Sequence, residues 1–312
     1  MILTVTLNAS VDKLYVLDRL SPYEVMRVKE VNNTAGGKGL NVSRAAALAG
    51  ERVTAMGFVG GYNGMLLESL IREDGIEKQF THVRAETRCC VNVRDEETNR
   101  STEFLEPGSP VTPEEVQRFL SDFKAQLPKA GAVTISGSMP RGVPEDFYGV
   151  LVREARRQRI PVILDSSGPA LKNALSAGPS MIKPNSDEIR QLFNVEIGSR
   201  QDLIAAAKQL RQSGIAAVAV SLGKDGVLVV CGEGVYHGIT PDVPVVNTVG
   251  CGDSMVAGFA VSMVRREPMK QAIRFAVAVS TANALTKETG SFRQEDLVKL
   301  LGQIRVEQLE KG

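Results

Sequence analysis

The stretch Asn247-Thr248-Val249-Gly250-Cys251-Gly252-Asp253-Ser254 carries the signal on which the fold of this chain depends. Its two glycines let the backbone turn sharply and approach a ligand closely. The apolar run that begins there, Cys251–Val264, predicts a helix whose free N–H groups and positive dipole end lie at the same point. Such a turn can hold an anion, and Asp253 is explained as a base that takes a proton from a hydroxyl while the backbone stabilises developing phosphoryl charge. Taken alone, the segment is slightly better explained as a tight turn whose aspartate caps the helix.

A second glycine-rich turn, Gly36-Gly37-Lys38-Gly39-Leu40-Asn41-Val42, opens another predicted helix over Asn41–Ala49. It is not a Walker A loop, because Lys38 is followed by Gly39 and not by serine or threonine. No G-x-G-x-x-G pattern follows the first predicted strand, Ile2–Leu7, so a nicotinamide-dependent oxidoreductase is disfavoured.

Two further polar motifs come directly after predicted strands, at the strand ends where open α/β sheets bind ligands. They are Ser136-Gly137-Ser138-Met139-Pro140-Arg141-Gly142 and Lys183-Pro184-Asn185-Ser186-Asp187-Glu188. The second motif combines a cation, an amide and a carboxylate, which suits phosphates and Mg²⁺. A third segment, Ser221-Leu222-Gly223-Lys224-Asp225-Gly226, links two strands through glycines and on its own is explained by a simple hairpin.

Short apolar strands alternate with amphipathic helices along most of the chain, which predicts an α/β fold with a parallel sheet covered on both faces. Strands are expected at Ile2–Leu7, Arg52–Val59, Ala132–Ser136, Val162–Asp165, Met181–Lys183 and Ala216–Ser221. Helices are expected at Asn41–Ala49, Met65–Arg72, Glu145–Arg157, Gln201–Gln212, Cys251–Val264, Met269–Thr286 and Gln294–Val306. The capping box Thr112-Pro113-Glu114-Glu115 starts one more helix, which should run to about Leu127.

Two segments, 11–31 and 84–106, break this alternation because neither carries a strong helical period. In the second segment, Cys90–Arg94 alternates, the polar tract 95–100 predicts a turn and Ser101–Leu105 extends again, so a hairpin is expected. Extra strands of this kind in an α/β chain usually form a flap over the cleft. We therefore expect residues 1–312 to form a single domain, with a small β-sheet lid contributed by about 11–31 and 84–106.

Charge and composition limit the partners. The 312 residues include 37 lysines and arginines against 36 aspartates and glutamates, a net charge of +1, so there is no general attraction to nucleic acid or to an anionic membrane. Four cysteines without a C-x-x-C pair, and only two histidines, disfavour structural zinc. The N-terminus lacks a signal-peptide pattern and no apolar run reaches roughly 18 residues, so we expect a cytoplasmic protein.

Together these motifs resemble the ribokinase-like carbohydrate kinases, specifically the phosphofructokinase-B branch. The Gly-Gly-Lys-Gly turn, the Lys-Pro-Asn strand end, the Ser-Leu-Gly turn and the Thr-Val-Gly-x-Gly-Asp-Ser-Met segment occur in family order and spacing over essentially the whole chain. Leu7-Asn8-Ala9-Ser10-Val11-Asp12, with Val143-Pro144-Glu145-Asp146-Phe147-Tyr148 later on, looks like the subgroup that contains 1-phosphofructokinase and tagatose-6-phosphate kinase. The resemblance implies a three-layer α/β/α ribokinase-like fold with a mostly parallel central sheet and a small β-sheet lid. It also implies that the protein uses ATP and Mg²⁺.

The resemblance also implies roles for individual residues. Asp253 matches the family's catalytic base, and the anion hole for the transferred phosphoryl group is matched by Gly250, Cys251 and Gly252. The positions implied to hold the sugar are Asp12, Gly37, Asn41 and Ser138. Those implied to bind the nucleotide are Lys183, Asn185, Ser221, Gly223, Gly226, Thr248 and Asn283, while Glu188 is implied to organise Mg²⁺ through water. The lid forms the dimer contact in many family members, so a homodimer is expected.

A substrate that already carries a phosphate needs cations to bind it. Lys38 stands where glycine is common in related kinases, and Arg27 and Arg88 lie in the predicted lid. Our hypothesis is that these three residues bind the substrate phosphate, although a solvated surface charge explains Arg27 equally well. The expected reaction transfers the γ-phosphate of ATP to a ketohexose monophosphate, first of all fructose 1-phosphate, to give fructose 1,6-bisphosphate. The alternatives are tagatose-6-phosphate kinase and a non-catalytic sugar-phosphate-binding protein, which would have no need of the base Asp253.

Cys251 stands at an anion-hole position where the family usually has alanine or serine. Because only the backbone N–H is needed there, the substitution should leave activity intact. A thiol at a helix N-terminus can have a lowered pKa. We therefore expect alkylation of Cys251 to inactivate the protein and Cys251→Ala to protect it.

Overall fold

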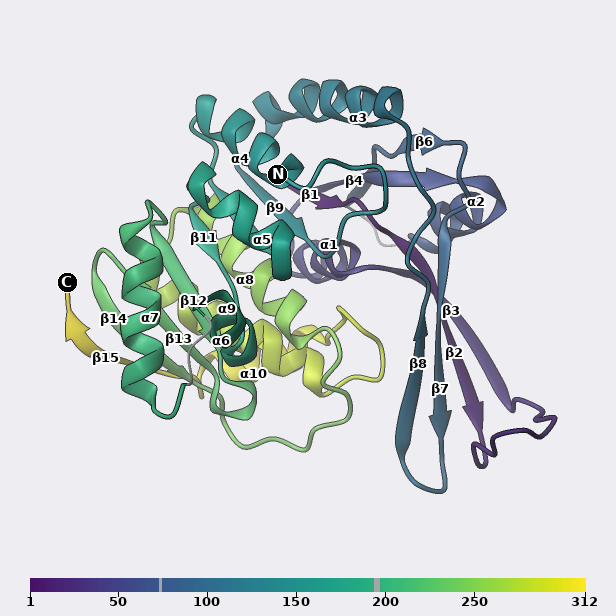
Figure 1. The fold of residues 1–312 in the computed structure, drawn as a ribbon. Coiled ribbons are helices and arrows are strands. Elements are labelled where there is room, and N and C mark those ends of the chain that lie inside the picture. Colours follow the sequence, from purple (N-terminus) through teal and green to yellow (C-terminus); the bar gives the residue numbers. More distant parts are fainter. Residues whose placement is uncertain (73–74, 194–196) are drawn as a thin grey trace.

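The computed structural model describes residues 1–72, 75–193 and 197–312, which form one large sheet between layers of helices and a second, smaller sheet (Figure 1). The strands of the large sheet are β1 (Ile2–Thr6), β4 (Val53–Gly60), β5 (Ile76–Lys78), β6 (Thr81–Val83), β9 (Ala132–Ser136), β10 (Val162–Asp165), β11 (Met181–Ile182), β12 (Ala217–Ser221), β13 (Val227–Cys231), β14 (Gly234–Ile239) and β15 (Arg305–Lys311). Their order is β15-β14-β13-β12-β11-β10-β9-β1-β4-β5, and β6 also pairs with β4. All pairs from β5 to β12 are parallel and those from β12 to β15 are antiparallel, so the mostly parallel central sheet is confirmed.

Helices cover both faces of this sheet. One layer contains α3 (Pro113–Gln126), α4 (Phe147–Arg157), α5 (Gly168–Ala174), α6 (Ser186–Phe193) and α7 (Arg200–Gln212), and the other contains α1 (Lys38–Leu48), α8 (Cys251–Arg265), α9 (Met269–Ala284) and α10 (Gln294–Leu301). Successive side chains of a buried strand point to opposite faces of the sheet, so each strand contributes to both cores. In β10, Val162 and Leu164 face the first layer and Ile163 faces the second. The capping box at Thr112 is present and starts α3 as expected.

The small sheet projects from the large one (Figure 1) and has the order β3-β2-β7-β8. Its strands are β2 (Ser10–Leu17), β3 (Glu30–Gly36), β7 (Arg88–Asp95) and β8 (Arg100–Leu105), and α2 (Gly61–Leu70) packs between it and β4. The hairpin expected within 84–106 is confirmed. The first lid segment is longer than expected and runs from Ser10 to Gly36. Its second strand, β3, is polar and mostly exposed, so the sequence shows no alternation of apolar residues that would have predicted it.

The expectation of one helix over Gln294–Val306 is wrong. Helix α10 ends at Leu301, and the chain then forms strand β15, which pairs antiparallel with β14. The reason is tertiary, because β14 would otherwise leave a row of unpaired backbone groups at the edge of the sheet. Strand β15 covers that edge and is itself mostly exposed and charged. In the part of the chain that the structure describes, no helix is long and apolar enough to cross a membrane.

Candidate active site

The candidate site lies along the carboxyl edge of the parallel strands. Ser138 follows β9, Asp165 ends β10, Lys183 and Asn185 follow β11, and Ser221 ends β12. An isolated parallel bridge pairs Asn185 with Ser221, so these two candidates for nucleotide binding lie side by side. The strand-end motifs therefore meet at one edge, where open α/β sheets bind their ligands.

The turn before α8 presents backbone N–H groups to this edge. Gly250 caps the helix with φ 81°, in the left-handed region that favours glycine. A Cβ at Gly250 would also lie 2.5 Å from Cγ2 of Thr289 and 3.0 Å from the nitrogen of Gly290. A Cβ at Gly252 would lie 3.3 Å from Nζ of Lys183, so a buried ammonium stands directly beside the first turn of the helix. Helix N–H groups and this ammonium together make a site for an anion.

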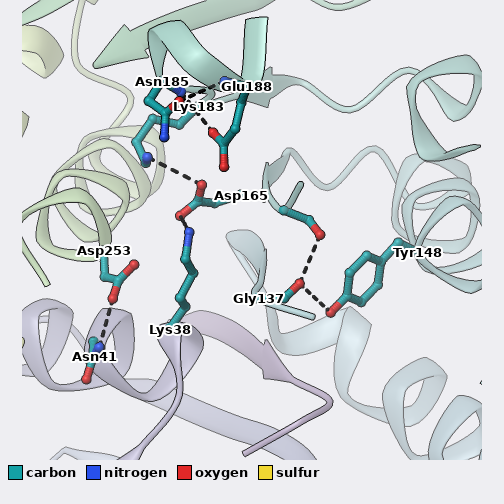
Figure 2. Close-up of polar contacts among 10 residues, drawn as sticks. Lys38, Asn41, Gly137, Tyr148, Asp165, Lys183, Asn185, Glu188 and Asp253 are labelled. Atoms are coloured by element: carbon teal, nitrogen blue, oxygen red, sulfur yellow. Dashed lines mark hydrogen bonds and ion pairs between the residues drawn. The ribbon is translucent and has the colours of Figure 1, made fainter. Parts of the chain in front are cut away.

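Asp253 lies in the first turn of α8 and is only 6% exposed. Its Oδ2 accepts a 2.7 Å hydrogen bond from Nδ2 of Asn41, on α1 (Figure 2). Burial, followed by the negative charge of Asp165, raises the pKa of Asp253 to about 6. Lys38, Asn41 and Lys183 act on this pKa in the opposite direction. A carboxylate with this pKa is mostly ionised at neutral pH and takes up a proton more readily than an ordinary aspartate, as a general base requires.

Asp165 is a residue that the sequence-based assignment of the site missed, yet it holds both lysines (Figure 2). It is 1% exposed, its Oδ1 lies 3.3 Å from Nζ of Lys183, and its Oδ2 lies 3.6 Å from Nζ of Lys38. The charge of this carboxylate is the largest cause of the raised pKa of Lys38. The signal in the sequence was an aspartate at the end of the apolar strand Val162–Asp165. An aspartate is almost never fully buried unless it is paired, and open α/β sheets bind ligands at this end of their strands.

Asn185 and Glu188 form a reciprocal cap at the start of α6, in which each side chain accepts a hydrogen bond from the backbone N–H of the other residue. Oε2 of Glu188 accepts a 2.9 Å bond from the Asn185 nitrogen, and Oδ1 of Asn185 accepts a 2.8 Å bond from the Glu188 nitrogen. The Glu188 carboxylate points toward Asp165 (Figure 2). Mg²⁺ is usually held by one or two carboxylates together with substrate phosphates and water, and Glu188 fits that role. Within residues 1–72, 75–193 and 197–312 no group of three or more His, Cys, Asp or Glu could hold a metal by itself.

A pocket of about 460 Å³ opens beside this cap and is lined by Asn185, Ser221 and Gly223, among others. The turn from Ser221 to Gly226 joins the antiparallel strands β12 and β13, which confirms the hairpin. Gly226 has φ 93°, and a Cβ there would collide with the carbonyl oxygen of Gly238. Thr248 lies exposed in the loop before α8. The turn therefore offers backbone groups at the mouth of the pocket, as a nucleotide site needs.

The expected sugar-binding residues gather where the small sheet meets α1. Oδ1 of Asp12 accepts a 2.6 Å bond from Oγ of Ser10, and the Asp12 carboxyl fills the space that a Cβ at Gly36 would need. Burial raises the pKa of Asp12, while the charge of Arg88 acts in the opposite direction. Gly37 caps α1 with φ 110° and so directs the helix from the small sheet toward Asp253.

Asn8, which the sequence-based assignment also missed, joins Arg88 to Ser138. Nε of Arg88 donates a 3.1 Å bond to the Asn8 carbonyl, and Nδ2 of Asn8 donates a 3.1 Å bond to Oγ of Ser138. Nη1 of Arg88 donates a 2.9 Å bond to the Glu106 carbonyl. Both of these acceptors are neutral carbonyls, so the bonds fix the guanidinium without forming an ion pair, and its charge, which also acts on Asp12, can attract an anion.

The profile of the pfkB family carbohydrate kinases matches residues 5–296. This chain belongs to the pfkB family. It is 37% identical over 309 residues to the tagatose-6-phosphate kinase of a Staphylococcus epidermidis strain, covering 98% of this chain and 99% of that one. Phosphofructokinase-2 from Escherichia coli, in complex with potassium, superposes with a TM-score of 0.90 at 31% identity over 97% of this chain and 98% of that one. A possible 1-phosphofructokinase from Thermotoga maritima gives a TM-score of 0.85 at 28% identity, covering 99% of both chains.

The pfkB-family kinase described here therefore has the three-layer α/β/α ribokinase-like fold that was expected, and it is a phosphotransferase. The three cations proposed to bind a substrate phosphate have different surroundings in the structure. Lys38 reaches toward Asp165, and the charge of Asp253 is a further cause of its raised pKa. Arg27 lies exposed in the loop between β2 and β3. The register pairs Ser10 with Gly36 and Val16 with Glu30, so this loop is at the end of the small sheet far from Gly36.

Asn283 of the kinase braces the anion turn from within the core. It is fully buried, and its Oδ1 accepts a 2.7 Å bond from the Gly290 nitrogen. Its Nδ2 donates to the Val249 carbonyl at 3.0 Å and to Sγ of Cys251 at 3.4 Å. A side chain with no exposed surface and these partners holds the turn in place, so the expected direct contact between Asn283 and the nucleotide is not supported.

The expectation of a lowered pKa at Cys251 is wrong. The thiol is half-buried at the start of α8, and burial raises its pKa although the hydrogen bond from Asn283 acts in the opposite direction. The nearby charge of Asp253 raises the pKa further. The helix dipole favours the thiolate at this position, but removal of the thiol from water outweighs it. Little thiolate forms at neutral pH, so alkylation of Cys251 should be slow. Rapid inactivation by a thiol reagent is therefore not expected.

Asp253→Asn should make the kinase more stable at alkaline pH. A carboxyl whose pKa rises from 3.8 to about 6 on folding contributes stability that is fully present below pH 3.8 and is lost as pH rises through 6. At pH 8 the ionised carboxylate costs up to about 3 kcal/mol, a cost that the neutral asparagine removes. Calorimetry should show a higher melting temperature for the variant at pH 8 and a smaller difference at pH 5. Equal differences at both pH values would mean that this pKa is not raised.

Proposed function

We propose that this kinase transfers the γ-phosphoryl group of ATP to a hydroxyl of a ketohexose monophosphate, with Asp253 as the general base. The observation that carries the proposal is the position of Asp253. It is a buried carboxylate in the first turn of a glycine-capped helix, next to N–H groups and a buried ammonium. A binding protein would gain nothing from a carboxylate in an anion site, whereas a kinase needs a base where the phosphoryl group arrives.

The proposed reaction is a direct transfer. The acceptor hydroxyl loses its proton to Asp253, its oxygen forms a bond to the γ-phosphorus, and the bond from that phosphorus to the β-γ bridging oxygen breaks, so ADP leaves. The turn Gly250–Gly252 and Lys183 stabilise charge on the transferred group. We also assign Lys38 to this group, because it pairs with Asp165 and the charge of Asp253 contributes to its raised pKa. Bound Mg²⁺ would neutralise charge on the phosphates of ATP, next to Glu188.

The nucleotide is proposed to lie along the turn from Ser221 to Gly226, above the pocket beside Asn185. Its phosphates would then extend toward Lys183 and the start of α8. Thr248, exposed in the loop before that helix, stays a candidate for contact with the nucleotide.

The sugar is proposed to lie between the small sheet and α1. Asp12 and Asn41 are suited to hold its hydroxyls, and Gly37 leaves its backbone open to them. The small sheet would close over this substrate as a lid, and residues 1–312 would act as one kinase domain with that lid.

Arg88→Ala should raise KM for the sugar phosphate by about 10- to 100-fold, because a charge-assisted bond to phosphate contributes roughly 1.5–3 kcal/mol. KM for ATP should stay nearly unchanged, because Arg88 is held by Asn8 and Glu106 on the sugar side. Steady-state kinetics with each substrate varied in turn give both constants. Equal increases in the two KM values would contradict a role in binding the substrate phosphate.

The acceptor is proposed to be fructose 1-phosphate, with tagatose 6-phosphate as the second candidate. The match to a possible 1-phosphofructokinase over 99% of both chains supports the first, and the 37% identity to a tagatose-6-phosphate kinase supports the second. A coupled assay of ADP release distinguishes them when it is run with fructose 1-phosphate, fructose 6-phosphate, tagatose 6-phosphate and the unphosphorylated sugars. The highest kcat/KM identifies the acceptor, and a preference for an unphosphorylated sugar would overturn the proposal.

A homodimer formed through the lid is proposed from the apolar side chains that the small sheet exposes. Val31 on β3, and Phe104 and Leu105 on β8, are between 52% and 66% exposed. These are the two edge strands of the small sheet, and exposed apolar edges favour pairing with another chain. Sedimentation should show a dimer of the native chain and a monomer of the Phe104→Asp/Leu105→Asp variant. A monomeric native chain would refute the proposal.

A further inference from the structure

We propose that Arg44 is a positioning residue for the general base, because it fixes the side-chain amide of Asn41 so that its N–H₂ group faces Asp253. The inference rests on the proposed role of Asp253. Arg44 lies one turn after Asn41 on α1, and it is not among the residues that the sequence motifs single out.

The contacts form a short relay. Nη2 of Arg44 donates a 2.6 Å hydrogen bond to Oδ1 of Asn41, and Nδ2 of Asn41 donates a 2.7 Å bond to Oδ2 of Asp253. A guanidinium has only donors, so it can bind only the oxygen end of the amide. The nitrogen end must then face the carboxylate. The carboxylate, which only accepts, requires the same orientation, so Arg44 anchors the far end of the amide and holds its N–H₂ group against the base.

The guanidinium is itself held on two sides. Nη1 donates a 2.7 Å bond to the carbonyl of Ala35, in β3 of the small sheet, and Nε donates a 3.3 Å bond to the carbonyl of Thr289. The next residue, Gly290, packs on α1 so closely that a Cβ there would lie 2.8 Å from Cα of Asn41. Arg44 thus connects the small sheet, the loop after α9 and the base through one half-buried side chain.

Loss of Arg44 frees the Asn41 amide to move away from the carboxylate, because the bond that anchors its oxygen is gone. Asp253 then loses a hydrogen bond that stabilises its charged form, so its pKa should rise. The other charges that act on Asp253, Lys38 of α1, Asp165 of β10 and Lys183 after β11, stay in place. Arg44 is itself a positive charge, which also lowers the pKa of Asp12. A rise in the pKa of Asp253 that follows replacement of Arg44 in the native chain, but not in an Asn41→Ala background, therefore reports the relay through Asn41.

The test compares Arg44→Met with the native kinase. Partners of a functional group in its outer shell typically contribute 10- to 100-fold, so we expect kcat to fall by about that factor while KM for ATP stays within about twofold. The acidic limb of the kcat profile should move to higher pH. Arg265→Met is the control, because Arg265 also donates to a backbone carbonyl, that of Ala49, and bonds the side chain of Glu51 at the far end of α8. It should lose stability and keep kcat.

A double-mutant cycle of Arg44 and Asn41 distinguishes a positioning role of Arg44 from a merely structural one. In an Asn41→Ala background, Arg44→Met should lower kcat no further, because the amide that it orients is gone. An equal fall in both backgrounds, or an unmoved pH profile, would overturn the proposal. If Arg44→Met does not fold, Arg44→Leu, which also lacks a donor, serves for the same comparisons.

The pKa of Asp253 can also be read without turnover, from the carboxyl carbon by NMR. A higher value in Arg44→Met than in the native chain supports the relay, and an unchanged value refutes it. If the native chain transfers no phosphoryl group to any sugar phosphate, the proposed function fails, while this measurement still decides the relay.

Discussion

Asp253→Asn is expected to lower kcat by about 10³- to 10⁴-fold, at the upper end of what a positioned general base contributes. Asparagine has nearly the same shape but cannot take the proton of the acceptor hydroxyl. The residue is only 6% exposed, so water has little room to replace it as the base. Binding of ATP should persist, because the turn Gly250–Gly252 and Lys183 are unchanged. Steady-state kinetics and calorimetric titration with ATP measure the two quantities.

Asp296→Asn is the matched control for this variant. Asp296 is also buried, at 8% exposure, but it pairs with Arg293 at the start of α10, away from the phosphoryl site. It should lose stability and retain kcat. A native kcat in Asp253→Asn, or an equal loss in Asp296→Asn, would show that the carboxylate at 253 is not the base.

Lys183→Met is expected to lower kcat by about 10²- to 10³-fold, the range that follows removal of one preorganised charge-stabilising group. Methionine keeps much of the side-chain volume without the charge beside Gly252. The variant leaves Asp165 with Lys38 alone, at 3.6 Å, so it should also lose stability. The kinetic loss should appear mainly in kcat, because charge on the phosphoryl group is greatest during transfer.

A double variant separates the two effects of Lys183→Met. Asp165→Asn/Lys183→Met removes both charges of the buried pair, so the melting temperature should recover while kcat stays low. Lys208→Met provides a control, because Lys208 pairs with Glu310 on the far edge of the large sheet and should not affect kcat. Recovery of kcat in the double variant would contradict the role of Lys183 in phosphoryl transfer.

Much of the fold could be predicted because its signals are local. The capping box at Thr112 starts α3 through contacts within four residues, and Val162–Asp165 is a strand because its apolar run has the length of one. The turn Gly250–Gly252 could likewise be assigned, since glycines before an apolar helix act through backbone alone. Strand β15 could not be predicted, because it exists only through pairing with β14, much earlier in the chain. His237, for example, pairs with Glu307, which lies 70 residues later.

The site was predicted less completely than the fold, for the same reason. Asp253 and Lys183 lie within motifs, whereas Asp165 matters through two lysines that come from distant segments. The sequence also shows nothing of burial, which places Asn283 in the core and raises the pKa of Cys251. Arg27 and Arg88 both lie in lid segments, but the register of β2 with β3 places the loop that carries Arg27 at the end of the small sheet far from Gly36.

The most direct test of the account is to follow the γ-phosphoryl group itself. The native kinase is incubated with Mg²⁺, ATP labelled in the γ-phosphoryl group and fructose 1-phosphate, tagatose 6-phosphate or free fructose, and the labelled products are separated. The account predicts label in a sugar bisphosphate, one ADP for each bisphosphate formed, and little transfer to free fructose. Label found only in inorganic phosphate, or equally in free fructose, would contradict it.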